Sequence, residues 1–505
     1  MTESHGMTGS RTMTDSGATA STLVRRVALP AGAALVVLVA LIATAAVPST
    51  SVPPPTVVPV VSTELVCPNV TSAPNVSTRV SAVTPSEFAT GIGAALIGTP
   101  ARAVAIGSIA GGAHALVKAA PTGSTAVVGR ASGGRAPGFA LDQLTASSRT
   151  ADHGLAGATC TEPTNDAWFV GTGSGVGHTS MLYLTDPEPT SATVDVDIYN
   201  TGGAVAAPSV QGVVVPAHGR RVLSLDRVAP GAGTVAVHVT ASAGRVGAAV
   251  FDAQVDGLIP QGADWVPMAE SPARRVVVPG LGGGQGSRRL TVFAPGEGTA
   301  TVHVTLVGTQ GSFTPTGAAS VEIDRGKVTT LDLGPAAAND QTGAVVESDV
   351  PIVAGVRWRI TSGRVDELAF SAGTPALTAP AVISGNQVDA GFGTALMLTA
   401  PGAAAKVSVQ VLVSGVPSGV PRVVTVAGGT TARTPIARGV KGVFDVVLTP
   451  VAGGRAGAGG SVFAAVLRTR AVDGASGTTV SVVRNSRVTV PVPQARPDLD
   501  VGLGR

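Results

Sequence analysis

Residues 181–187, MLYLTDP, form a short hydrophobic run that ends in a proline turn, and this pattern occurs three times in the chain. It returns as LTVFAPG at residues 290–296 and as LMLTAPG at residues 396–402. The turn prolines are spaced by 108 and 106 residues (295 − 187 and 401 − 295). Solenoid repeats have periods of roughly 20 to 50 residues, whereas an immunoglobulin-type sandwich has about 100 residues. The repeated unit is therefore predicted to be a whole domain.

The residues after each turn alternate between apolar and polar side chains. TVDVDIY at residues 193–199 is the clearest example, and TVHVTLV at residues 301–307 and KVSVQVLV at residues 406–413 follow the other two turns. A closing strand also recurs, as VGAAVF at residues 246–251 and AGVRWRI at residues 354–360. Alternation with a period of two predicts strands that turn one face toward a core.

The predicted fold is all-β, with tandem immunoglobulin-like β-sandwich units after a single N-terminal transmembrane helix. The composition agrees, because 66 glycines and 36 prolines supply the turns that many short strands require. Only 3% of the residues are aromatic, so valine, alanine and leucine must fill the cores. We expect a first β-unit and three sandwich repeats, at residues 63–165, 166–268, 275–372 and 378–490.

The N-terminal part of the chain predicts a membrane anchor. Residues 1–24 have the composition of a disordered cytoplasmic tail, and Arg25 and Arg26 precede an uncharged apolar run at residues 27–47. These 21 residues are enough to cross a bilayer as a helix, and the flanking arginines favour a cytoplasmic N-terminus. Two interpretations remain open. An uncleaved signal anchor makes the protein single-pass in the cell membrane, and a signal peptide cleaved near Ala45 makes it secreted.

The predicted extracytoplasmic part begins with a Pro/Ser/Thr-rich stalk at residues 48–62 and ends in a tail at residues 491–505. The two cysteines of the chain, Cys67 and Cys160, lie at the two ends of the first β-unit. Outside the membrane such a pair predicts a disulfide that ties this unit together. The alternative is a pair of unbonded, buried thiols.

The stretch GLAGATCTEP at residues 154–163, which runs into WFVG at residues 168–171, resembles a family of actinobacterial secreted proteins of unknown function. The resemblance covers most of the chain after residue 25, and the Cys…Trp-Phe-Val-Gly stretch is its most specific part. It implies an N-terminal membrane anchor, repeated β-units, and an envelope setting beside large membrane glycosyltransferases. Many relatives have a second tryptophan where this chain has Ala167. The resemblance implies no catalytic residues.

No motif in the sequence indicates catalysis, a cofactor or a bound metal. The glycine-rich stretch at residues 171–177 lacks the lysine and the following helix of a phosphate-binding loop, so we interpret it as a flexible link between units. Asp195 and Asp197 alternate with apolar residues, and a solvated pair on one sheet face is favoured over a calcium site. His238 and His303 are interpreted as solvent-facing strand residues.

The scarce aromatic residues and the charge pattern narrow the function further. Trp168, Trp265 and Trp358 are interpreted as core anchors near unit junctions, in preference to platforms for sugars. The formal net charge is only +3, and the basic residues are scattered singly, which argues against a nucleic-acid partner.

The sequence thus predicts a binding or scaffolding component of the cell envelope that performs no catalysis. Its expected partner is an envelope protein or a cell-wall polysaccharide, and strand edges of the repeats suit pairing with another chain. The alternative is a carbohydrate-active enzyme or a glycan-binding module of the cell wall. In the enzyme, the carboxylates that converge would be Asp195, Asp197 or Asp252.

Overall fold

The computed structural model describes residues 55–100, 102–108, 114–117, 124–337, 340–362, 365–389, 391–436, 440–451 and 460–493. Outside them lie the predicted cytoplasmic tail, Arg25, Arg26, the predicted anchor, Ala45, residues 48–54 of the predicted stalk and residues 494–505 of the predicted C-terminal tail. Among the described residues, no helix combines the length and the hydropathy needed to span a membrane. Residues 57–490 form one compact unit.

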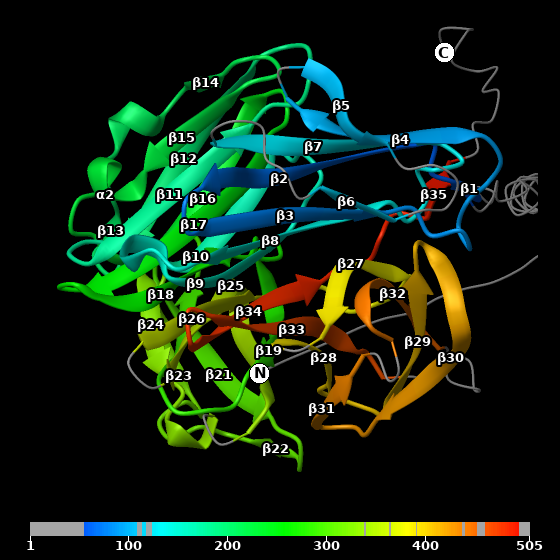
Figure 1. Cartoon of the computed structure of the whole chain (residues 1–505). Coiled ribbons are helices and arrows are strands. Elements are labelled where there is room, and N and C mark those ends of the chain that lie inside the picture. Colours follow the sequence, from blue (N-terminus) through cyan, green and yellow to red (C-terminus); the bar gives the residue numbers. More distant parts are fainter. Residues whose placement is uncertain are drawn as a thin grey trace, which may run out of the picture. The chain divides into compact units, whose positions relative to one another are not determined.

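The compact unit consists almost entirely of antiparallel strands, which confirms the predicted all-β fold (Figure 1). One pairing scheme recurs four times, in β2–β9, β10–β18, β19–β26 and β27–β34, which we call copies 1 to 4. The proline-turn pattern marks only copies 2 to 4, yet copy 1 pairs its strands in the same way. The repeat is therefore more extensive in the structure than in the sequence.

Each copy has two sheets. In copy 4 their strand orders are β27-β32-β29-β30 and β31-β28-β33-β34, and in copy 2 they are β10-β16-β12-β13, with β14 also on β12, and β15-β11-β17-β18. Copy 3 differs because one 21-residue strand, β25, pairs with β19 and β21 over its first half and with β20 and β26 over its second. In copy 1 the corresponding orders are β2-β7-β4-β5 and β6-β3-β8-β9.

The strands have the following bounds. Copy 1 contains β2 (Ser62–Ala73), β3 (Val76–Val83), β4 (Gly93–Thr99), β5 (Arg102–Ser108), β6 (His114–Val117), β7 (Ser124–Gly133), β8 (Ala140–Ser147) and β9 (Gly154–Thr159). Copy 2 contains β10 (Asp166–Ser174), β11 (His178–Thr185), β12 (Ala192–Asn200), β13 (Gly203–Ala204), β14 (Val213–Val215), β15 (Arg220–Ser224), β16 (Gly233–Ala243), β17 (Gly247–Asp256) and β18 (Ile259–Val266). Copy 3 contains β19 (Ala273–Leu281), β20 (Arg288–Phe293), β21 (Thr299–Val307), β22 (Ser312–Phe313), β23 (Val321–Asp324), β24 (Val328–Asp332), β25 (Thr342–Ser362) and β26 (Val365–Ala372). Copy 4 contains β27 (Ala381–Val388), β28 (Phe392–Ala400), β29 (Ala405–Val413), β30 (Val416–Val426), β31 (Thr430–Pro435), β32 (Gly442–Pro450), β33 (Phe463–Val472) and β34 (Ala475–Val483). Short strands β1 (Thr56–Pro59) and β35 (Thr489–Val492), the helix α2 (Leu225–Val228) and 3-10 turns at Thr150–Asp152, Pro208–Val210 and Pro335–Ala337 complete the elements.

The alternating sequence pattern decides which side chains fill each core. In β12, Val194, Val196 and Ile198 are buried, whereas Asp195 and Asp197 lie on the other, partly exposed face. The buried residues join apolar side chains from both sheets of copy 2 in one cluster. Copies 1, 3 and 4 have corresponding clusters of mostly valine, leucine and alanine. Removal of this apolar surface from water is the main force that holds each pair of sheets together.

The last strands of the four copies meet at the centre of the compact unit (Figure 1). β9 contacts β18 and β34, and β26 contacts the same two strands. The approach is close: a Cβ atom on Gly262 of β18 would lie only 2.2 Å from the backbone nitrogen of Leu368 in β26. The copies therefore pack around shared central strands, and they are not a row of separate domains.

The prediction that residues 171–177 form a flexible link is wrong, because residues 171–174 belong to β10. The glycines there serve the strand itself. Gly171 has φ +95° at a register shift in the pairing with β16. A Cβ on Gly173 would lie 2.4 Å from the imidazole of His178. Local backbone shape and close packing explain this glycine-rich sequence.

Candidate functional site

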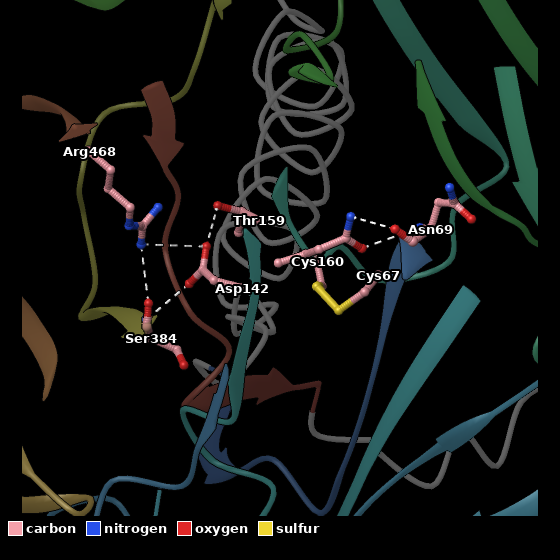
Figure 2. The surroundings of a disulfide bond; sticks show 8 residues. Cys67, Asn69, Asp142, Thr159, Cys160, Ser384 and Arg468 are labelled. Atoms are coloured by element: carbon pink, nitrogen blue, oxygen red, sulfur yellow. Dashed lines mark hydrogen bonds and ion pairs between the residues drawn. A yellow bond between two sulfur atoms is a disulfide. The ribbon is translucent and has the colours of Figure 1, made fainter. Parts of the chain in front are cut away.

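The disulfide predicted between Cys67 and Cys160 is present, so the alternative of two unbonded thiols is wrong (Figure 2). It connects β2 to the residue that follows β9, across 93 residues of sequence. Asn69 lies two residues beyond Cys67 and exchanges two hydrogen bonds with Gln143 of β8, at 3.2 and 2.7 Å. The disulfide therefore lies in a part of copy 1 that is also held together by hydrogen bonds and that faces the neighbouring copies.

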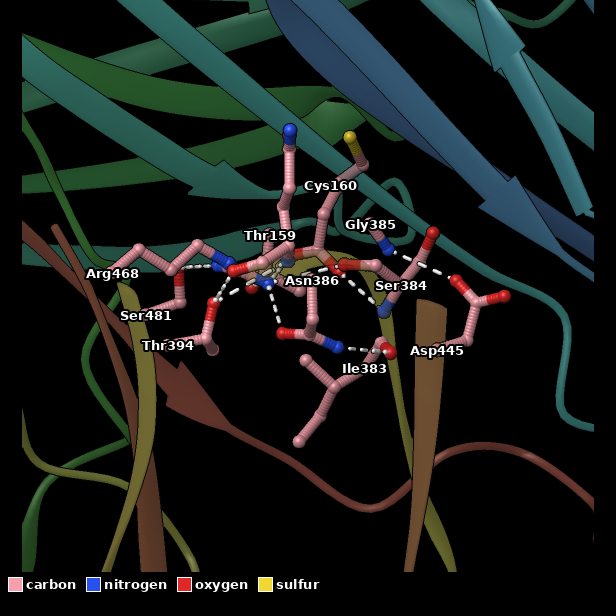
Figure 3. Close-up of polar contacts among 12 residues, drawn as sticks. Thr159, Cys160, Ile383, Ser384, Gly385, Asn386, Thr394, Asp445, Arg468 and Ser481 are labelled. Carbon is pink, nitrogen blue, oxygen red and sulfur yellow. Dashed lines mark hydrogen bonds and ion pairs between the residues drawn. The ribbon is translucent and has the colours of Figure 1, made fainter. Parts of the chain in front are cut away.

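A buried ion pair joins copy 1 to copy 4 beside this disulfide (Figure 2). The Asp142 carboxylate lies 3.9 Å from the Arg468 guanidinium, and the two residues are 6% and 2% exposed. Asp142 accepts hydrogen bonds from the Thr159 hydroxyl at 2.9 Å and the Ser384 backbone N–H at 3.0 Å. Arg468 donates to the Ser384 carbonyl and to the Ser481 hydroxyl (Figure 3). Each charge thus has partners in both copies. We call this contact between copies 1 and 4, around Asp142, Ser384 and Arg468, the seam.

Burial sets the electrostatics of this pair. It raises the pKa of Asp142, against the opposing effect of the Arg468 guanidinium, and it lowers the pKa of Arg468. A second buried carboxylate, Asp445, accepts from the Gly385 N–H at 3.0 Å (Figure 3). Gly385 has φ +66°, and a Cβ there would lie 2.2 Å from the Ser81 hydroxyl of copy 1. The seam consequently leaves no room for a larger residue at this position.

Toward the solvent, the same seam opens into a cavity of about 540 Å³. Arg79 of β3 and Arg470 of β33 lie over the ring of Phe392, with their guanidinium carbons 4.7 and 5.4 Å from the ring centroid. Arg470 and Phe392 are direct partners in the pairing of β33 with β28, which places both side chains on one face. The arrangement offers cationic groups on a rigid support, which suits binding of an anion.

A second buried polar cluster lies where the four central strands meet. Asp264 of β18 accepts hydrogen bonds from the Gly157 N–H at 2.9 Å and from the Thr479 hydroxyl, also at 2.9 Å. Glu367 of β26 is 1% exposed, and its carboxylate faces the backbone N–H groups of Leu155 and Thr478. The His153 Nδ1 atom lies 3.8 Å from Glu367 Oε1. All four copies contribute a residue to this cluster.

Burial controls the protonation of both central carboxyl groups. It raises the pKa of Glu367 to about 8 and the pKa of Asp264 well above its ordinary value. Glu367 therefore carries a proton near neutral pH, which avoids a bare charge in the protein interior. Because the cluster joins buried residues of all four copies, we expect it to affect the stability of the folded protein.

A third feature is a cavity of about 220 Å³ between copies 1 and 2. Tyr183, Phe251 and Trp265 line it, and the Trp265 ring centroid lies 5.3 Å from that of Tyr183 and 5.0 Å from that of Phe251. The Arg149–Asp152 ion pair also lines the cavity. Aromatic faces beside hydrogen-bonding groups are suited to the contact of a sugar ring.

The carboxylates considered from the sequence lie in different surroundings. Asp195 accepts from the Gly212 N–H at 2.7 Å, and Asp197 accepts from the Gln211 side chain at 3.3 Å, on the partly exposed face of β12. Asp252 is fully buried on β17, in the other sheet, and lies 3.2 Å from His178. The structure confirms the shared face of Asp195 and Asp197, and it shows no contact that joins them to Asp252.

The histidines and tryptophans mostly agree with their interpretation. His303 is exposed, but His238 is only partly exposed, because it stacks on Trp168 at 3.8 Å and bonds Asp166 at 2.7 Å. Trp168, Trp265 and Trp358 are 5%, 4% and 1% exposed, as expected of core anchors. In the described part of the chain, no three potential metal ligands of the His, Cys, Asp and Glu types gather in one place.

Sequence reasoning missed the residues of the seam between copies 1 and 4. Arg79 and its hydrogen-bond partner Gln387 are 308 residues apart, and no local motif marks either one. The available signal was weak: Arg468 and Arg470 are charged residues in a strand that otherwise follows the apolar pattern of the closing strands. Charge in such a strand indicates a buried partner elsewhere.

Comparisons with known proteins identify a family for most of the compact unit. A family model described as a family of unknown function, DUF5719, matches residues 115–437. No curated protein matches the chain. Among solved structures, the crystal structure of Thermotoga maritima 1070 is 17% identical and covers 21% of this chain and 95% of its own, with a TM-score of 0.17.

Proposed function

Because this chain belongs to the family of unknown function DUF5719, we propose its role from its own geometry: a non-catalytic binding or scaffolding component of the cell envelope. The observation that carries the proposal is the seam between copies 1 and 4. Buried bonds between residues hundreds of positions apart fix its interior, and a cavity of about 540 Å³ lies at its mouth. A rigid body with a preformed cavity loses little conformational entropy when it binds a partner.

We also propose that this body is extracytoplasmic and anchored through residues 27–47, with its N-terminus in the cytoplasm. The Cys67–Cys160 disulfide supports this placement, because such bonds persist in oxidising compartments. The two-sheet scheme of each copy supports assignment to the immunoglobulin-like sandwiches. The actinobacterial envelope setting rests on the sequence resemblance.

A glycan-binding module is a second candidate, favoured by one specific observation. The chain has few aromatic residues, yet Tyr183, Phe251 and Trp265 gather in the cavity between copies 1 and 2. Two further residues of the cavity lining, Arg149 and Asp152, supply hydrogen-bonding groups beside these rings.

Two measurements test the proposed function. Protease added to intact spheroplasts should digest the β-copies, and their protection would refute the extracytoplasmic placement. Affinity capture of the full-length chain from its native envelope should then recover a stable envelope-protein partner, while purified wall polysaccharide is neither retained nor cleaved. Retention of polysaccharide without cleavage, lost in Tyr183→Ala, would establish the glycan module instead. Release of sugar would contradict both candidates and indicate an enzyme.

A further inference from the structure

Two arginines flank one aromatic ring at the mouth of the seam between copies 1 and 4. The guanidinium carbons of Arg79 and Arg470 lie 4.7 and 5.4 Å from the Phe392 centroid. They are therefore at most about 10 Å apart, and both side chains line the same cavity, so one ligand in the cavity can contact both. They come from different copies, so the geometry exists only when the seam is closed.

Neither arginine forms an ion pair with a carboxylate of the described residues. Arg79 donates to two neutral acceptors, the Gln387 side-chain oxygen and the Gly385 carbonyl. Arg470 has no ion pair or side-chain hydrogen bond with any described residue, and its guanidinium group lies over the Phe392 ring. Two like charges held this close repel each other, and an anion placed between them would replace that repulsion with attraction.

A third guanidinium increases the positive field. Arg468 lies two positions from Arg470 on β33, deeper in the seam, where it faces Asp142. Burial, Arg468 and Arg470 together lower the pKa of Arg79 to about 10, so Arg79 remains a cation at neutral pH. The nearest opposing carboxylate, Asp389, is exposed and accepts a hydrogen bond from Gln387. Among the described residues that line the cavity, Arg79 and Arg470 face a single carboxylate, Asp389, which leaves one excess positive charge in the lining.

We propose that this cavity binds an oxyanion, a carboxylate or a phosphate group carried by an envelope ligand. The inference rests on the proposed binding function and names the chemical class that the function would recognise. A guanidinium presents a planar fork of donors that matches both kinds of oxyanion. The exposed Ser77 hydroxyl also lines the cavity and adds a polar contact.

Calorimetric titration of the purified full-length chain tests this inference, with inorganic phosphate and glucuronate as separate probes. At least one probe should bind saturably, and Arg470→Gln should weaken that binding by about tenfold or more. Arg470→Lys, which keeps the charge, should restore part of it. Arg433→Gln is the matched control, because Arg433 is exposed on β31 in the same copy. Binding of phosphate alone identifies a phosphate-bearing ligand, and binding of glucuronate alone identifies a carboxylate.

The inference is overturned if neither probe binds the wild-type chain, or if Arg470→Gln binds as tightly as Arg433→Gln. The thermal midpoint of each variant reports folding. If Arg79→Gln fails to fold, Arg470→Gln still tests the inference. The Arg470 side chain has no hydrogen-bond partner among the described residues, so its replacement leaves none of them unpaired. A partner captured from the envelope equally by wild type and Arg470→Gln would leave the binding function standing and reject only this anion site.

Discussion

At the scale of single residues, Glu367 makes the stability of the protein depend on pH. Its pKa is about 8 in the folded protein, against 4.5 for an ordinary glutamate, because the carboxyl group is buried at the centre. The folded state therefore holds the proton more tightly than the unfolded state. This contribution to stability is complete below about pH 4.5 and is lost as the pH rises through about 8.

Replacing Glu367 with glutamine should remove this pH dependence, because the amide does not titrate. We expect the wild type to lose up to about 5 kcal/mol of unfolding free energy between pH 4.5 and 8 through this residue, and Glu367→Gln to lose correspondingly less. Urea unfolding at several pH values measures the difference. Glu297→Gln, at an exposed glutamate, is the control. Parallel pH profiles for wild type and Glu367→Gln would contradict the assignment.

The Asp142–Arg468 pair should behave as a coupled unit in a double-mutant cycle. Either Asp142→Asn or Arg468→Met leaves the other group buried without its partner, and each should lower stability by about 3–5 kcal/mol. The double variant should lose clearly less than the sum of the two. Arg275→Met breaks an exposed ion pair with Glu347 and should change stability by about 1 kcal/mol or less. Additive losses in the cycle would show that the two side chains do not interact.

At the scale of elements, the disulfide closes a loop of 93 residues within copy 1. In the chain-entropy model, removing a disulfide that closes a loop of this length costs about 4.6 kcal/mol of stability, because the unfolded chain gains conformational freedom. The double variant Cys67→Ser/Cys160→Ser should accordingly unfold at a lower urea concentration than the oxidised wild type. Peptide mapping without reductant checks that the wild type carries the bond. An unchanged unfolding midpoint would contradict the expected role.

The elements themselves were largely predictable from the sequence, and their exceptions have physical causes. The alternating run at residues 193–199 lies within β12, as expected from its period of two. β10 was missed because its glycines resemble a linker, although they are required by a bulge and by the close approach of His178. The sequence also did not reveal that copy 1 pairs its strands as the other copies do. Copy 1 forms the same strand order without the proline-turn sequence that marks copies 2 to 4.

The candidate site was not predictable from the sequence, and the reason is geometric. Arg79, Phe392 and Arg470 lie in separate strands of two copies, and only the closure of the seam brings them together. A sequence period reveals which strands form within a copy, but it contains no signal for which copies touch. Cysteines were the exception, because the oxidising environment and their positions at the two ends of one unit predicted the bond.

At the scale of the whole compact unit, the central claim is that residues 57–490 form one body whose four copies depend on one another. β9, β18, β26 and β34 supply the shared centre, and each contacts at least two of the other three. Losing any one copy would expose the apolar flanks and buried charges of its neighbours to water. Both the anion site and the rigidity of the proposed scaffold depend on this mutual support.

Hydrogen–deuterium exchange of the full-length chain, followed by mass spectrometry across a urea series, tests this claim most directly. Peptides that contain β9, β18, β26 and β34 should lose protection together, at one urea concentration, because the central strands open only when the whole body unfolds. Loss of protection in four separate steps, one for each copy, would show that the copies are independent domains and would contradict the account.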